Sequence, residues 1–177
     1  MPDLKDLEGP TGKLNRLDAE EARAALLACC GSTRWADAVA ALRPFWDVGQ
    51  LLRIGRRAWF ELKAEDWLEA FRAHPRIGES AAARDTGEEA KRWSEGEQSR
   101  AREAGAETLD ELARANREYE ERFGFIYIVC ATGRTAEEML ALLRERLSND
   151  PETELRVAAE EQWRITELRL KKFLNVK

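Results

Sequence analysis

The sequence has few of the residues that build metal centres, disulfide frameworks and membrane spans. Among 177 residues there is 1 histidine, and the 3 cysteines, Cys29, Cys30 and Cys130, form no CxxC pair. This count argues against a zinc site, although carboxylates alone could bind a harder ion. We expect reduced thiols in a reducing compartment. The longest wholly apolar run, 123–131, is too short to cross a bilayer.

An excess of positive charge is also missing. The chain carries 29 lysines and arginines against 34 aspartates and glutamates, a net charge of −5. Because nucleic-acid binding requires a basic face, we expect no nucleic-acid partner. The N-terminus lacks the basic-then-apolar order of a signal peptide, and the C-terminus carries no address signal. We therefore expect a cytoplasmic protein without a membrane partner.

Helical signals fill most of the chain. Only 5 prolines and 11 glycines, with 44% apolar and 36% charged residues, are typical of an ordered and largely helical protein. Apolar residues at the 3.6-residue period predict helices over about 18–30, 32–42, 47–59, 64–73, 90–104, 108–123, 135–147 and 150–173. We predict an all-α fold, a single-domain bundle of about eight helices over 18–177, preceded by an N-terminal arm over 1–17.

Side chains at the expected helix starts support these boundaries. The candidate N-caps are Ser32 or Thr33, Asp47, Thr135 with Glu138 in a capping box, and Asp150 before Pro151. The helix after Ser32 is expected to turn Trp35, Val39 and Leu42 inward. Two segments stay undecided: 123–131 fits an extended piece or a buried helix, and 79–89 fits a lid or a solvated surface loop.

His74 is the side chain best suited to exchange protons near neutral pH. Pro75 disfavours helical geometry at His74, so the helix over 64–73 should end there. The partial negative charge of a helix C-terminus favours an imidazolium. The alternative is that His74 only caps this helix.

Polar residues interrupt other faces that would otherwise be apolar. At 100° per residue, Trp93, Ser94 and Glu97 share one helix face, although Ser94-x-x-Glu97 also spells a capping box. Asn116 falls on the inner face of its helix, where it either braces a neighbouring loop or lines a site. On the last helix Arg169 shares the inner face and needs an anion, either a structural carboxylate or a substrate.

Ordered motifs resemble a known family. They are Arg43-Pro44-Phe45, Asp66-Trp67-Leu68-Glu69-Ala70-Phe71 leading into His74-Pro75-Arg76-Ile77-Gly78, Trp93-Ser94 with Glu97-Gln98, Asn116-x-x-Tyr119, Arg122-Phe123-Gly124-Phe125, Arg146-Leu147-x-Asn149, Glu154 and Ile165-x-x-Leu168-Arg169-Leu170. Together they resemble the 2-oxo-4-hydroxy-4-carboxy-5-ureidoimidazoline (OHCU) decarboxylases, which catalyse the last step from urate to allantoin.

The resemblance implies an all-α bundle, OHCU as the small-molecule substrate, (S)-allantoin as the product, no metal or organic cofactor, and a possible homodimer. It implies that His74 is the catalytic acid/base and that Glu97 is its partner. The residues that it places around the substrate are Pro75, Ser94, Glu95, Gly96, Gln98, Val129, Cys130, Ala131, Thr132, Gly133 and Arg169.

Two other functions fit the residues. A non-catalytic helical interaction module would pair the inward polar groups with one another, including Arg169 with Glu97. A hydrolase of a related ureide would use a positioned water, or Cys130 as the nucleophile with His74 as base. Cys130 lies in an apolar run, which favours a core position over that role.

Overall fold

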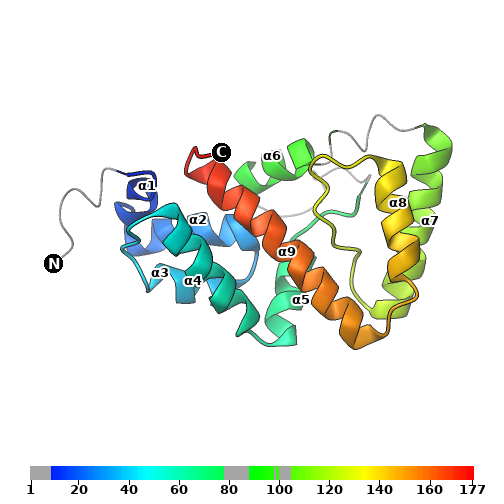
Figure 1. Ribbon diagram of the computed structural model, residues 1–177, viewed down its shortest axis with the longest axis horizontal. Helices are drawn as coiled ribbons and strands as arrows, with labels where there is room; N and C mark the ends of the chain where they lie inside the picture. The colour runs from blue at the N-terminus through cyan, green and yellow to red at the C-terminus, as the bar shows by residue number, and fades with distance from the viewer. Residues whose placement is uncertain (1–8, 78–87, 98, 100–104) are drawn as a thin grey trace. The chain divides into compact units, whose positions relative to one another are not determined.

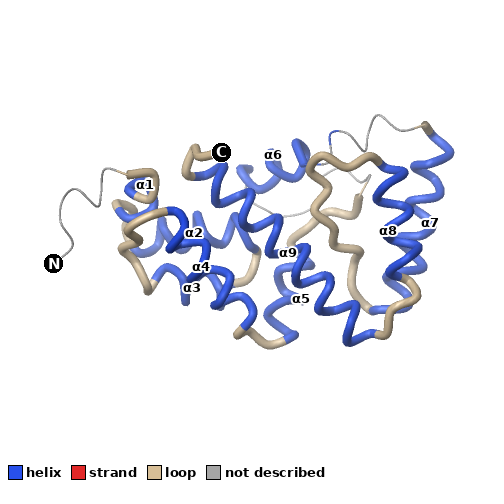
Figure 2. Tube along the Cα trace, in the orientation of Figure 1, coloured by secondary structure: helices blue, strands red, loops and turns tan. Residues whose placement is uncertain are grey.

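The computed structural model describes residues 9–77, 88–97, 99 and 105–177, and every regular element in these ranges is a helix (Figure 2). The helices are α1 (Gly12–Asn15), α2 (Ala19–Cys30), α3 (Thr33–Ala40), α4 (Val48–Phe60), α5 (Ala64–Arg72), α6 (Glu88–Glu97), α7 (Ala106–Phe123), α8 (Ala136–Arg146) and α9 (Pro151–Phe173) (Figure 1). The all-α prediction is confirmed, and its eight helices correspond to α2–α9. None of the described helices is long and apolar enough to cross a membrane.

The chain divides into two compact units. One comprises the residues up to Ala70 together with Trp163–Lys177, and the other comprises Phe71–Gln162. The long helix α9 supplies residues to both units, and the predicted site residues other than Arg169 fall within the second.

Tryptophans form the core of the first unit. Trp35 and Trp59 are completely buried, and the ring of Trp163 meets that of Trp35 edge-on with centroids 6.5 Å apart. Gly55 lies where these rings converge, because a Cβ atom built there would lie 3.0 Å from the Trp163 ring and 3.3 Å from the Trp35 ring. The Trp35 indole N–H donates to the Gly55 carbonyl at 2.8 Å. A side chain at position 55 would therefore displace the packed indoles.

Two expectations for the first unit are wrong. Within the predicted arm over 1–17, Gly12–Asn15 form helix α1 and Leu14 is fully buried. Thr11 donates its hydroxyl to the Phe45 carbonyl at 2.9 Å, which ties this segment to the residues after α3. Leu42 is 55% exposed, because α3 ends at Ala40 and the helical period that would turn Leu42 inward does not continue.

The second unit packs an irregular segment against a helix pair. Helices α7 and α8 lie side by side (Figure 1). Between them residues 124–135 form neither helix nor strand, which decides the open question over 123–131 in favour of a non-helical piece. This segment is buried nonetheless: Ile126, Tyr127, Ile128, Val129 and Ala131 are 2–8% exposed.

Other boundaries in the second unit differ from the sequence prediction. Helix α6 begins at Glu88 and ends at Glu97, whereas the prediction ran to residue 104. The expected loop over 79–89 lies outside the described residues except for Glu88 and Glu89, as do Gln98, residues 1–8 and residues 100–104. On α7, Asn116 is buried as predicted, as is Leu112 one turn earlier, while Ala113 is exposed.

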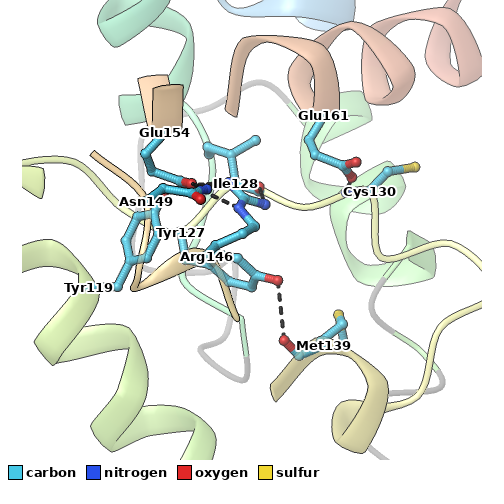
Figure 3. A network of polar contacts seen from close by, with 9 residues as sticks. All are labelled: Tyr119, Tyr127, Ile128, Cys130, Met139, Arg146, Asn149, Glu154 and Glu161. Atoms are coloured by element: carbon cyan, nitrogen blue, oxygen red, sulfur yellow. Dashed lines mark hydrogen bonds and ion pairs between the residues drawn. The ribbon is translucent and has the colours of Figure 1, made fainter. Parts of the chain in front are cut away.

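A buried polar network supports the irregular segment (Figure 3). Arg146 at the end of α8 donates to the Ile128 carbonyl at 2.8 Å and forms an ion pair with Glu154 of α9 at 2.5 Å. Glu154 also accepts hydrogen bonds from the Tyr119 hydroxyl and, at 2.8 Å, from the Asn149 amide. Every oxygen of this fully buried carboxylate is therefore hydrogen-bonded.

The protonation states of the network follow from burial and from the ion pair. Burial and the neighbouring Glu154 raise the pKa of Tyr119, so its phenol stays a neutral donor. Burial raises the pKa of Tyr127 to about 12. For Arg146, burial opposes the charged form, yet the Glu154 carboxylate outweighs it and the pKa is raised. The Arg146 guanidinium thus remains charged near neutral pH.

Substituting Gly55→Ala should destabilise the protein by about 1–3 kcal/mol, because the added methyl overpacks the Trp35–Trp163 contact. The matched control is Gly96→Ala in α6, where a Cβ meets nothing within 4 Å. This control should leave stability unchanged or raise it by up to about 1 kcal/mol through helix propensity. Urea unfolding followed by tryptophan fluorescence measures both, and equal stability of the two variants would contradict the close packing.

Substituting Glu154→Gln should cost about 3–5 kcal/mol, because it leaves the buried Arg146 guanidinium without its counter-charge. Glu152→Gln, two residues earlier on α9, removes one partner of an exposed ion pair to Arg156. That control should change stability by no more than about 1 kcal/mol. Urea titration measures the free energy of unfolding of both variants. A small loss of stability in Glu154→Gln would show that the network is dispensable.

Candidate active site

His74 lies just beyond the end of α5, as predicted. Helix α5 ends at Arg72, and the His74 backbone N–H donates to the Phe71 carbonyl at 3.1 Å, a tightened last turn. Pro75 follows and cannot continue the helix. The imidazole is 8% exposed and its Nε2 atom is buried. This imidazole at the break of a helix is therefore largely excluded from bulk water.

Three contacts fix the segment that carries His74. The Phe71 ring packs on the Phe125 ring with centroids 5.4 Å apart. Ile77 belongs to the same hydrophobic core as Val129 and Ala131. Between them Arg76 forms a bidentate ion pair with Glu120 of α7, both hydrogen bonds being 2.9 Å. The short stretch without regular structure at His74 is therefore held at both ends.

Glu97 is buried at the end of α6, with an exposed fraction of 9%. Ser94 lies inside this helix, six residues after its start at Glu88. An N-cap residue precedes the first helical turn, so the capping-box interpretation of Ser94 and Glu97 is wrong. Glu95 and Gly96 are exposed, and Gln98 lies outside the described residues.

The predicted substrate segment 129–133 changes from buried to exposed along its length. Val129 and Ala131 are buried, Cys130 is partly buried, and Thr132 and Gly133 are exposed. Gly133 adopts φ 81°, a left-handed conformation that glycine tolerates without strain. The segment thus runs from the core to the surface of the second unit.

The Cys130 thiol of this segment has a raised pKa. Burial raises the pKa of the Cys130 thiol, and the negative charges of Glu161 and Glu97 raise it further. The charges of Glu97 and Glu161 therefore act in the same direction on the Cys130 thiol. Because the raised pKa disfavours a thiolate, it argues against Cys130 as a nucleophile.

Glu161 of α9 is a buried carboxylate that the sequence analysis did not single out. It is 8% exposed, and its Oε2 accepts a hydrogen bond from the Cys130 backbone N–H at 2.7 Å (Figure 3). Arg146, which the sequence marks only through the Arg146-Leu147-x-Asn149 motif, donates to the carbonyl of Ile128, two residues before Cys130. The irregular segment is therefore held by one cation and one anion.

Asn116 lines a cavity of about 410 Å³ in the second unit. Its side-chain amide donates to the Leu112 carbonyl of its own helix at 3.0 Å, so this donor does not brace a neighbouring loop. The cavity is lined by Arg76, Ile77, Leu109, Asp110, Leu112, Ala113, Asn116, Arg117 and Glu120. It lies beside the residues that directly follow His74 and Pro75, and the Arg76–Glu120 ion pair forms part of its wall.

Arg169 is buried in the first unit, with an exposed fraction of 4%. Burial raises the pKa of the nearby Cys30 thiol to about 12, while the Thr166 hydroxyl and the Arg169 charge oppose that rise. The inner face predicted for α9 is confirmed, since Gln162, Thr166 and Arg169 are buried and Arg164 is exposed. Binding of substrate by Arg169 stays a prediction.

Within the described ranges, no group of three or more histidine, cysteine, aspartate and glutamate side chains is arranged to hold a metal ion. Among the described side chains, the one suited to proton transfer near neutral pH is that of His74.

Comparisons with known proteins agree with the motifs. The family model for OHCU decarboxylase matches residues 15–171. The 2-oxo-4-hydroxy-4-carboxy-5-ureidoimidazoline decarboxylase of Haloferax volcanii is 30% identical over 167 residues, covering 89% of this chain and 92% of the relative. The uric acid degradation bifunctional protein TTL of Arabidopsis thaliana is 43% identical over 151 residues.

The fold agrees as well. A crystal structure of OHCU decarboxylase in the presence of (S)-allantoin has a TM-score of 0.75 and 40% identity, covering 86% of this chain and 98% of that chain. The match to the Arabidopsis protein covers 84% of this chain but only 46% of that longer relative. Because the family model matches residues 15–171, nearly the whole of this chain, the chain belongs to the OHCU decarboxylase family.

Proposed function

We propose that this chain decarboxylates OHCU to (S)-allantoin, with His74 as the acid/base and Glu97 as its partner. The observation that carries the proposal is the burial of the only histidine, at 8% exposure, within a motif that resembles the family's. The second unit also holds the buried Glu97 and the backbone segment 129–133. These are the parts that a proton-transfer reaction on a small polar molecule requires.

The reaction breaks the bond between the quaternary ring carbon and its carboxylate. The electron pair of that bond flows into the adjacent ring imine as carbon dioxide leaves, and the neighbouring carbon is then protonated on one face. His74 supplies or relays this proton, and a single buried donor accounts for a single enantiomer. Since the substrate carries its own electron sink, the side chains only need to bind, orient and move a proton.

Glu97 keeps the imidazole in the productive tautomer and orientation. Carboxylates beside histidines act in this way because they accept the N–H that faces them and stabilise the imidazolium. The backbone of 129–133 offers amide groups to the carbonyl and ureido oxygens of the substrate. Arg169 is proposed to bind the anionic end of the substrate, and Pro75 and the Ser94–Gln98 stretch are proposed to contact it.

Replacing His74→Gln should abolish turnover while the fold persists. The substrate is generated in place from urate by the two upstream enzymes, and its decay is followed by ultraviolet absorbance and circular dichroism. The wild type should accelerate decay to optically active allantoin. The variant should leave only the spontaneous rate and a racemic product. Near-full activity of His74→Gln would remove His74 from the mechanism.

Glu97→Gln should lower the rate by a factor of about 100 or more, because the amide cannot stabilise an imidazolium. Glu118→Gln on the exposed face of α7 is the matched control and should be fully active. Thermal unfolding accompanies both assays. An unchanged rate with a lower melting temperature would instead assign Glu97 a purely structural role.

A further inference from the structure

The backbone at Cys130 poses a problem of hydrogen bonding that Glu161 solves. Residues 126–131 are largely buried and have no regular secondary structure, so neighbouring strands or helical turns do not satisfy their polar groups. At Cys130 the N–H instead donates to the Glu161 Oε2 at 2.7 Å. A charged acceptor gives a shorter and stronger bond than a neutral one.

Burying that carboxylate is costly. Glu161 is only 8% exposed, and a buried charge destabilises a fold unless hydrogen bonds and neighbouring charges compensate it. An uncharged side chain would bury more cheaply at this position of α9. The function of the carboxylate therefore has to be sought in what it holds, which is the backbone at the start of 129–133.

Glu161 also acts on a predicted site residue, because its carboxylate binds the Cys130 amide. Its charge and that of Glu97 both act on the Cys130 thiol, whose pKa they raise together with burial. A displacement of the Cys130 amide would shift the backbone of 129–133, which the proposed function assigns to the substrate.

We propose that Glu161 is a positioning residue: it holds the Cys130 amide and thereby fixes the backbone of 129–133 that receives the substrate. This inference rests on the proposed decarboxylase function. Glu161 acts through the length and direction of its side chain, because the hydrogen bond sets where the backbone lies. A displacement of about 1 Å in a substrate-binding element can cost about 100-fold in rate.

Two substitutions separate the effect of side-chain length at position 161 from the effect of its charge. Glu161→Gln keeps an acceptor oxygen at the same distance and removes the charge, whereas Glu161→Asp keeps the charge and withdraws the oxygen by one methylene. Glu161→Leu removes both. Positioning predicts that Glu161→Gln retains kcat/KM within about threefold, while Glu161→Asp and Glu161→Leu lose about 10- to 100-fold, mainly through a raised KM.

The control is Glu152→Gln, which alters an exposed ion pair on the same helix and should have wild-type kinetics. Amide hydrogen exchange at Cys130, measured by NMR, reports the hydrogen bond itself. Exchange should stay slow in the wild type and in Glu161→Gln and become faster in Glu161→Asp and Glu161→Leu. Labelling of the Cys130 thiol, the partly buried cysteine, should become faster in Glu161→Gln because the loss of charge lowers its pKa.

Two results would overturn the proposal. One is wild-type kcat/KM in folded Glu161→Asp and Glu161→Leu with unchanged exchange at Cys130. The other is an active Glu161→Asp beside an inactive Glu161→Gln, which would assign the effect to charge. If Glu161→Leu does not fold, the Asp and Gln variants decide alone. A wild type that fails to accelerate OHCU decay would refute the proposed function, whereas the exchange data would still decide whether Glu161 holds this backbone.

Discussion

The second unit depends on satisfying a buried backbone that has no regular structure. Helices satisfy their own amides and carbonyls, but residues 126–131 run through the core without doing so. The Arg146 guanidinium donates to the Ile128 carbonyl, and the Glu161 carboxylate accepts from the Cys130 amide. Neither partner could be apolar, because each unpaired buried backbone group costs about 1–3 kcal/mol. The charged side chains on α8 and α9 are therefore a consequence of the path of this segment.

The network that supports this segment is cooperative, because its hydrogen-bond donors share the Glu154 carboxylate. Glu154 binds Arg146 through one oxygen and Asn149 through the other, while Tyr119 joins at the first. Removal of any one member leaves the others buried with unmet hydrogen bonds, so the loss exceeds that of a single contact. Such a network specifies one geometry of the backbone rather than a range, which is what a site that protonates one face of its substrate needs.

Local signals predicted the helices well because caps and periods act over a few residues. Asp47 and Thr135 cap α4 and α8 as expected, each accepting a backbone N–H of the first turn. The sequence prediction failed where tertiary contacts determine the local structure. The hydrogen bond from Thr11 to the Phe45 carbonyl orders a stretch whose composition resembles a loop. The path of 123–131 could not be predicted, since a short apolar run fits a strand or a helix equally well.

At the candidate site the sequence identified His74 and Glu97 but assigned no role to Glu161, and the reason lies in the geometry of α9. An amphipathic analysis assumes one buried face, which here holds Gln162 and Arg169. Glu154 and Glu161 are seven residues apart and lie roughly 80–100° from Gln162 around the helix, at the edge of one wide buried arc. A helix that is buried over so wide an arc has no separate apolar stripe to mark its edge. Only the path of residues 126–131 explains why carboxylates occupy it.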